Sequence, residues 1–180
     1  MARTTFQGPV RSLGGIYQQG PATTVGVTAS VTLSPDSYAG RFITVGGTLA
    51  SDIVLTLPAI NTSSNPTTSG PGQDPSTANN EGVTYTIWVP TTIATSSLKI
   101  TVTSGSSDVF VGSLMSVDTD TSGAMVGFTS SSNTFINLNG TTTGGVAGSW
   151  IQIVAIASDK YMVTGVILGS STVATPFANS

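Results

Sequence analysis

Residues 150–168 read Trp-Ile-Gln-Ile-Val-Ala-Ile-Ala, then Ser158-Asp159, then Lys-Tyr-Met-Val-Thr-Gly-Val-Ile-Leu. Two runs rich in apolar and β-branched residues flank one short polar pair, and this pattern predicts an antiparallel β-hairpin. If Ser158-Asp159 is the whole loop, Trp150 lies opposite Ile167. A Ser-Asp pair lacks the glycine that favours a tight two-residue turn, so a longer loop is the alternative.

Both faces of this predicted hairpin are largely apolar. In the register given above, one face holds Ile167 and five further large side chains: Trp150, Val154, Ile156, Tyr161 and Val163. A strand pair that is apolar on both faces is covered on both sides. The cover is either a second sheet of the same chain or another subunit. We expect these five residues to contribute to a subunit interface.

The rest of the chain is also rich in strand patterns. Residues 24–33 alternate apolar and polar side chains without a fault, which predicts one half-buried strand. Further strands are expected at residues 41–45, 53–57, 83–89, 98–103, 109–117, 124–129 and 134–138. With the hairpin, the total is about ten short strands and no helix. The predicted fold is all-β, an antiparallel β-sandwich or barrel.

Composition favours a single β domain over residues 23–180. A chain of 180 residues fits one domain, and its 55 Ser and Thr residues and 21 Gly residues are typical of strands and turns. One long irregular loop interrupts it at residues 58–82, where four of the nine prolines lie. A loop of this length is usually either functional or disordered. We expect a mobile surface insertion, with a recognition loop as the alternative.

Residues 1–22 are predicted to form an extended N-terminal arm. Two Gly-Pro pairs and one Gly-Gly pair interrupt any regular element, yet the segment holds more large apolar residues than a solvated tail would carry. Arg3 and Arg11 give the first 35 residues a charge of +2, whereas the other three basic and all eight acidic residues give −5. We therefore expect a basic arm that docks on a surface of this chain or of a partner.

Targeting and membrane signals are not evident. No apolar region follows Arg3, so we expect no signal peptide, and no run approaches the roughly 18 apolar residues of a membrane helix. The chain has no Cys, which leaves the redox compartment open. We expect a soluble or assembled protein whose partners include neither membrane nor nucleic acid.

The residue types that carry most catalysis are also missing. Without His or Cys the chain lacks the commonest general base, the thiol nucleophile and most transition-metal ligands. Most of its carboxylates lie at predicted turns, where Asp caps the backbone. Asp118-Thr119-Asp120 is similar to the start of a calcium loop, but the closing Glu is absent, so a turn is the preferred interpretation. We expect no enzymatic activity, no cofactor and no metal.

Trp88 lies on the polar face of its predicted strand. Such an aromatic side chain can stack on a sugar in a binding module. The preferred interpretation is that it packs under a loop or at a subunit contact, because aromatic residues are enriched at interfaces.

Short motifs spread over nearly the whole chain support a family resemblance. In order, they are Phe6-Gln-Gly-Pro-Val-Arg-Ser12, Val54-Leu-Thr-Leu-Pro-Ala59, Gly82-Val-Thr-Tyr-Thr-Ile-Trp-Val89, Thr142-Thr-Gly-Gly145 leading into Trp150, and Ala174-Thr-Pro-Phe177. Taken in this order, they resemble the small capsid decoration (cement) proteins of tailed bacteriophages, particularly of marine and cyanobacterial phages. The 58–82 loop departs from the compact pattern of that family.

The resemblance implies a non-enzymatic virion protein on the outer capsid surface, commonly a homotrimer, that braces neighbouring subunits of the major capsid protein. On this basis we expect Arg3, Phe6 and Arg11 to anchor the arm on the capsid, and Phe177 to anchor the C-terminal tail. Two other classes stay open. A tail-fibre or receptor-binding module shares the Thr-, Ser- and Gly-rich composition, and a secreted carbohydrate-binding module would need a signal peptide.

Overall fold

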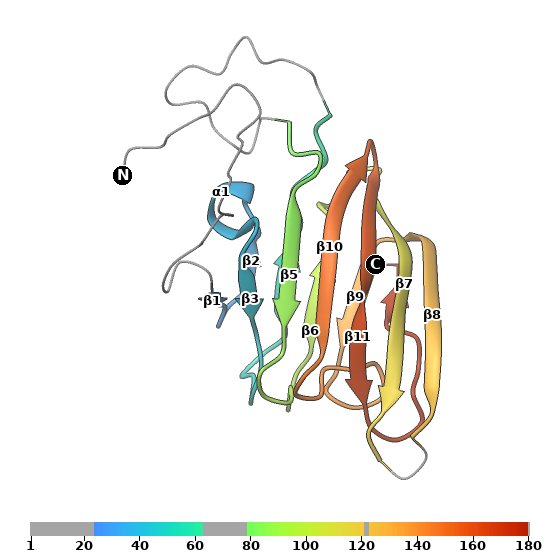
Figure 1. Cartoon of the computed structure of the whole chain (residues 1–180). Helices are drawn as coiled ribbons and strands as arrows, with labels where there is room; N and C mark the ends of the chain where they lie inside the picture. The colour runs from blue at the N-terminus through green and yellow to red at the C-terminus, as the bar shows by residue number, and fades with distance from the viewer. Residues whose placement is uncertain (1–23, 63–78, 121–122, 180) are drawn as a thin grey trace, which may run out of the picture.

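Two β-sheets lie face to face in the computed structural model, which describes residues 24–62, 79–120 and 123–179 (Figure 1). The seven-stranded sheet has the order β1-β3-β5-β10-β11-β7-β8, and the five-stranded sheet has the order β12-β9-β6-β4-β2. The strands are β1 (Thr24–Gly26), β2 (Val31–Thr32), β3 (Phe42–Thr44), β4 (Ile53–Thr56), β5 (Thr84–Trp88), β6 (Leu98–Thr101), β7 (Val109–Asp118), β8 (Met125–Asn133), β9 (Phe135–Leu138), β10 (Trp150–Ala157), β11 (Lys160–Gly169) and β12 (Phe177–Ala178). The predicted all-β sandwich is confirmed, and in the described residues the helical content is one four-residue turn, α1 (Pro35–Tyr38).

The first six strands alternate between the two sheets, which corrects the expectation of antiparallel strands. β1, β3 and β5 are neighbours in one sheet and β2, β4 and β6 are neighbours in the other, and all four of these pairings are parallel. A parallel pair needs a crossover between its strands, commonly a helix. Here the crossover is a strand in the opposite sheet. Both sheets therefore contain parallel and antiparallel pairs. Hydrophobic alternation could not predict this, because it does not depend on strand direction.

The strand predicted over residues 24–33 is in fact two strands in different sheets. β1 pairs with β3, whereas β2 pairs with β4. Of the predicted apolar side, Val27 and Leu33 are buried and Val25 and Val31 are half-buried, whereas Ala29, between the two strands, is exposed. The alternation therefore matches the burial within each strand, but it does not show where the chain leaves one sheet for the other.

The second half of the chain is built largely from antiparallel pairs. β10 pairs antiparallel with both β5 and β11, and β7 pairs antiparallel with β8. The exception is β11, which runs parallel to β7. This arrangement places the closing β10–β11 hairpin in the middle of the seven-stranded sheet, where its two edges are both hydrogen-bonded.

The core fills the space between the sheets. Its largest fully buried side chains include Tyr85, Phe110 and Tyr161, together with Leu and Ile residues from both sheets. The rings of Phe110 and Tyr161 are in tilted contact, with centroids 6.4 Å apart. Aromatic pairs at this separation add to the stabilisation from area burial alone.

Buried polar contacts hold both ends of the predicted 58–82 loop against the core. The Tyr161 hydroxyl donates to the Pro58 carbonyl oxygen at 2.6 Å, and the Ile60 N–H donates to the Asp108 carboxylate at 3.1 Å. The Asn80 side chain donates to the Ala59 carbonyl at 2.9 Å. The loop therefore starts and ends at fixed positions, while residues 63–78 lie outside the described part of the chain.

Candidate interaction surface

The closing hairpin has one buried face and one exposed face, which corrects the predicted register. Trp150 lies opposite Val166, not Ile167, because Ile156 is an extra, bulged residue between the Ala155–Tyr161 and Ala157–Lys160 pairs. A bulge of one residue exchanges the faces of all side chains beyond it relative to the partner strand. Asp159 adopts a positive φ of 61° in the turn, so Ser158-Asp159 closes the hairpin without glycine.

The five predicted interface residues are consequently divided between the two faces. Tyr161 and Val163 are buried in the core, at 0% and 1% exposure. Trp150 and Ile156 are exposed, and Val154 is half-buried on the outer side. The prediction is therefore wrong for Tyr161 and Val163, whose side chains the second sheet covers. The other three lie on the outer face of the seven-stranded sheet, which we call the outer face.

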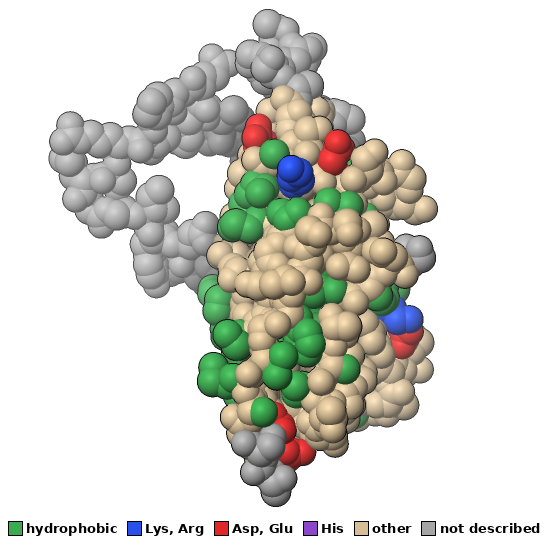
Figure 2. Space-filling view, turned by 90° about the vertical axis from the view of Figure 1, so that its right-hand side faces the viewer, with side chains coloured by type: hydrophobic (Ala, Val, Ile, Leu, Met, Phe, Trp, Pro, Cys, Tyr) green, Lys and Arg blue, Asp and Glu red, His purple; other side chains and the backbone are tan. Residues whose placement is uncertain are grey.

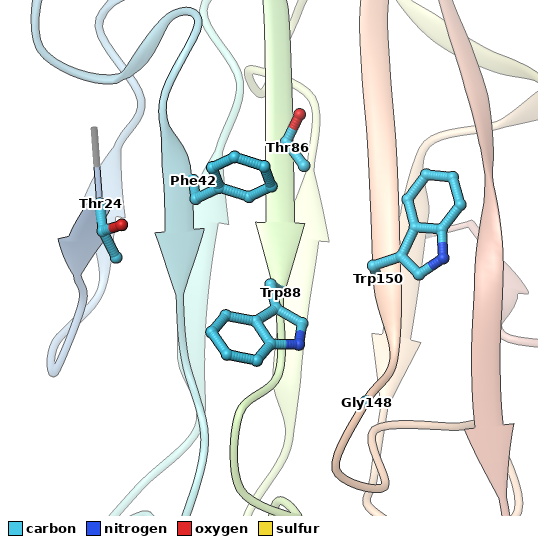
Figure 3. Close-up of a pocket in the computed structure, with 6 residues that line it drawn as sticks. All are labelled: Thr24, Phe42, Thr86, Trp88, Gly148 and Trp150. Carbon is cyan, nitrogen blue, oxygen red and sulfur yellow. The ribbon is translucent and has the colours of Figure 1, made fainter. Parts of the chain in front are cut away.

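Three aromatic residues gather at one end of the outer face. Trp88 on β5 is the direct partner of Trp150 on β10, and Phe42 on β3 is the partner of Thr86 on β5. Figure 3 shows Phe42 on β3, Trp88 on the neighbouring strand β5 and Trp150 on β10, the next strand of the sheet. Thr24, Thr86 and Gly148 complete the lining of a shallow hollow of about 410 Å³. We call it the aromatic hollow.

Backbone constraints in β11 help to place Trp150. Gly165 has a φ of 156°, and a Cβ atom there would clash with the carbonyl oxygen of Trp150 and lie 2.9 Å from the Cα of Ile151. Only glycine adopts this conformation readily and leaves this space. The close approach of β10 to β11 at the aromatic hollow therefore depends on Gly165.

Apolar residues continue from the aromatic hollow across the outer face. Register pairs Trp150 with Val166 and Val166 with Met115, so one row of side chains crosses three strands. Met115 and Met162 are 38% and 37% exposed. Figure 2, turned by 90°, shows hydrophobic side chains along its left-hand profile, the side on which this sheet lies. Of the described residues that point outward from this sheet, Lys160 at the start of β11 is the one with a charge.

The outer face of the five-stranded sheet is more polar. One row across it reads Thr32, Thr56, Thr101 and Phe135. Lys99 on β6 forms an ion pair with Asp52 and lies 5.9 Å from the centre of the Phe135 ring. The Lys99 ammonium and the Ser97 N–H, which both bond to the Asp52 carboxylate, lower the pKa of Asp52. Exposed apolar area is therefore concentrated on one side of the sandwich.

Trp88 and the two ends of the chain can now be placed. Trp88 is 42% exposed on the outer face, so it is not packed under a loop, and a subunit contact or a stacked sugar are its two remaining interpretations. Phe177 is 6% exposed, packs in the core and pairs with Ile136, so it does not form the predicted capsid anchor. Arg3, Phe6 and Arg11 lie outside the described residues.

Sequence reasoning missed three members of this surface: Phe42, Met115 and Met162. Phe42 and Met115 lay in predicted strands, but their exposure depends on which sheet covers each strand. The predicted register places Met162 on the face opposite to Trp150 and Val154, because it does not include the bulge at Ile156. With the correct register, strand alternation would have placed Met162 on the same face as Trp150.

The acidic pair at the end of β7 has the contacts of a turn. The Asp118 carboxylate accepts the Asp120 N–H at 3.0 Å, and the Asp120 carboxylate accepts the Ser171 N–H at 2.6 Å. Within the described ranges, no three His, Cys, Asp or Glu side chains are grouped closely enough to hold a metal ion. No helix in these ranges is long and apolar enough to span a membrane.

Two buried tyrosines, Tyr85 on β5 and Tyr161 on β11, lie on the inner side of the seven-stranded sheet. Burial raises the pKa of both Tyr85 and Tyr161 above the ordinary value of 10.0, because the ionised form loses its hydration. The Tyr161 hydroxyl is hydrogen-bonded to Pro58, whereas the Tyr85 hydroxyl has no partner among the described residues. Both groups serve the core and are separated from the outer face by the sheet.

Comparison with known proteins gives no relative: no family model, no curated protein and no solved structure matches this chain.

Proposed function

We propose that this chain is a non-enzymatic structural protein of a tailed-phage particle, which decorates the outer surface of the capsid and braces neighbouring capsid subunits. Its partners in this proposal are the major capsid protein and further copies of itself, as a homotrimer. The outer face provides the protein contact, through Trp150, Val154 and Ile156. Arg3, Phe6 and Arg11 of the N-terminal arm provide the anchor on the capsid.

One observation supports a protein contact at this face: the large exposed apolar side chains are concentrated on one side of the sandwich, with one charged residue among them. Trp88, Trp150 and Phe42 are each at least 39% exposed. Monomeric proteins rarely expose contiguous apolar patches of this kind, whereas interface cores are depleted in charge and enriched in aromatic residues and Met. The assignment of the partner to a phage capsid depends on the sequence resemblance alone.

The first test is the copy number of this protein in purified particles of the phage that encodes it. Quantitative mass spectrometry should give an abundance comparable to that of the major capsid protein. A few copies per particle would instead place the protein in the tail, as a fibre or receptor-binding module. Its absence from particles would contradict every virion role.

A matched pair of variants then tests the surface itself. Val154→Asp introduces a carboxylate on the outer face and should reduce incorporation into particles. Val54→Asp introduces the same group on the opposite face, where Lys99 is the direct neighbour, and should leave incorporation unchanged. Circular dichroism of both variants controls for folding. Equal incorporation of the two variants would count against the outer face as the contact.

Oligosaccharide binding is a second candidate function, favoured by the aromatic hollow. Sugar rings stack on exposed aromatic faces, and the hollow combines three such side chains with the hydroxyl groups of Thr24 and Thr86. A glycan array should then show binding that Trp88→Ala abolishes. Phe135→Ala, which removes an aromatic ring from the opposite face, is the control. A negative array with the wild-type chain would exclude this candidate for the glycans displayed.

A further inference from the structure

One of the four edges of the sandwich differs from the rest. β1, β2 and β12 are edge strands of two or three residues, whereas the edge strand β8 has nine, Met125–Asn133. An edge strand presents unpaired N–H and C=O groups that can pair with another chain, and proteins commonly limit this by keeping such strands short. β8 is not limited in this way.

The other usual forms of edge protection are also sparse in β8. Met125–Asn133 contains no charged residue and no proline. A bulge lies between Ser130 and Asn133, but Met125–Ser130 pairs with β7 without interruption over six residues. Met125 and Val126 at its start are 66% and 37% exposed. A regular, uncharged edge of this length is suited to accept a further strand.

Gly127, in the middle of this regular segment, has no steric requirement for glycine from any described residue. At Gly112 and Gly165, a Cβ atom would clash with the backbone of the neighbouring strand, so both positions require glycine. At Gly127 there is no atom within 4 Å of the Cβ position, and its φ is not in the left-handed region. Glycine in a strand weakens it and often marks a site where another backbone approaches closely.

We propose that β8 is a docking edge for β8 of a second copy, which adds antiparallel around a two-fold axis and joins the two seven-stranded sheets. The two-fold dimer is the commonest closed assembly, and it presents the same surface from each copy. β8 brings no like charges together in this arrangement. Main-chain hydrogen bonds hold the added strand, as in other cases of β-strand addition.

The N-terminal arm fits this edge less well than β8 itself. Residues 8–21 are broken by Gly8-Pro9, Gly14-Gly15 and Gly20-Pro21, and residues 1–7 carry Arg3. Proline cannot donate a hydrogen bond to a strand ladder. The β8 contact is a two-fold dimer of the purified chain. It is separate from the homotrimer proposed on the capsid, whose contact is the outer face.

Sedimentation velocity of the full chain over a range of concentrations tests this proposal. The wild-type chain should form a dimer, and Gly127→Lys should weaken dimerisation about tenfold or more, because it places a charge at the edge. Open space at Gly127 allows the side chain without disturbing the fold. Gly26→Lys is the matched control on the edge strand β1, where a Cβ atom meets only an ordinary 3.6 Å contact.

Four results would overturn the proposal. A wild-type chain that is monomeric at every concentration has no such contact. Loss of the dimer in both lysine variants would indicate head-to-tail pairing of β1 with β8. Loss after deletion of residues 1–22 would make the arm the occupant. A dimer that survives Gly127→Lys but not Val154→Asp would assign the contact to the outer face.

Hydrogen exchange gives a second readout on the same samples. The amides of Met125–Ser130 that point away from β7 should be protected in the dimer. They should exchange faster in Gly127→Lys, while the protection of the central strand β10 stays the same. Equal exchange at β8 in both proteins would contradict the proposal.

Discussion

The two faces of the β10–β11 hairpin are both apolar, yet they have different surroundings. On the inner face, Ile153, Tyr161 and Val163 are at most 1% exposed and pack against the second sheet. On the outer face, Trp150 and Met162 are 39% and 37% exposed, and no described part of the chain covers them. The same strands, with the same backbone hydrogen bonds, therefore contribute to a core on one side and to a free surface on the other.

This difference shows that apolar character alone does not identify a core. Burial of a strand's face depends on a second layer, and the seven-stranded sheet has that layer on one side in the described residues. An apolar face without a second layer is better explained by a partner than by chance, because its exposed residues are large and contiguous. Substitutions on the two faces should consequently affect different properties.

The largest difference is expected for a carboxylate introduced on each face. Val163→Asp buries an unpaired charge, which should cost more than about 4 kcal/mol, a large part of the typical stability of about 5 to 15 kcal/mol. Val154→Asp on the outer face should change the free energy of unfolding by less than about 1 kcal/mol. Urea denaturation followed by circular dichroism measures both. Similar losses would mean that the outer face is also part of the folded core.

Truncation of large side chains should give the next largest difference. Ile153→Ala leaves a cavity between the sheets and should destabilise the protein by about 2 to 5 kcal/mol. Met162→Ala on the outer face leaves no enclosed cavity and should cost less than about 1 kcal/mol. Thermal unfolding of the two variants tests this. A comparable loss for Met162→Ala would show that its side chain is buried in the free protein.

A smaller effect is expected within the inner face itself. Tyr161→Phe removes the hydroxyl that donates to Pro58 and leaves a buried carbonyl oxygen without that bond, at a cost of about 1 to 3 kcal/mol. Tyr85→Phe removes a buried hydroxyl without a described partner and should be neutral or slightly stabilising. Chemical denaturation compares the two variants. A loss at Tyr85 equal to that at Tyr161 would show that its hydroxyl is also hydrogen-bonded.

The smallest effect concerns alkaline pH. Both buried tyrosines have a raised pKa in the folded state, so above pH 10 the unfolded chain releases protons that the folded chain retains. Stability from these groups is fully present below pH 10 and falls as the pH rises above it, by about 1 kcal/mol or less per tyrosine at pH 10.5. The double variant Tyr85→Phe, Tyr161→Phe should lose this dependence. An unchanged slope in the variant would assign the effect to other groups.

Much of the fold could be predicted from the sequence, and the limits have physical causes. Alternation identified most strands and their buried sides, because side chains in a strand point to opposite faces with a period of two. Strand direction and sheet membership were not predictable from alternation, as the division of residues 24–33 between two sheets shows. The hairpin was found, but the bulge at Ile156 shifted its register by one residue.

The candidate surface was predicted only in part. Trp88, Trp150, Val154 and Ile156 were singled out by the sequence and lie on the outer face, while Tyr161 and Val163 belong to the core. Phe177 was expected on a partner and is instead buried beside Ile136. For Tyr161, Val163 and Phe177 the sequence correctly indicated a large side chain that needs a packing partner. The strands that bury these side chains are distant in the sequence, so the partner could not be predicted.

The sequence by itself determined that this chain forms many strands, places an apolar hairpin near its end and lacks His and Cys. These properties are local, because they depend on side-chain type and a two-residue period. The tertiary structure decided that the first six strands alternate between two sheets and that one apolar face is buried and the other exposed. It also decided that, in the described residues, the long strand β8 lies at a sheet edge. These properties depend on which distant segments pair and on how many layers cover each sheet.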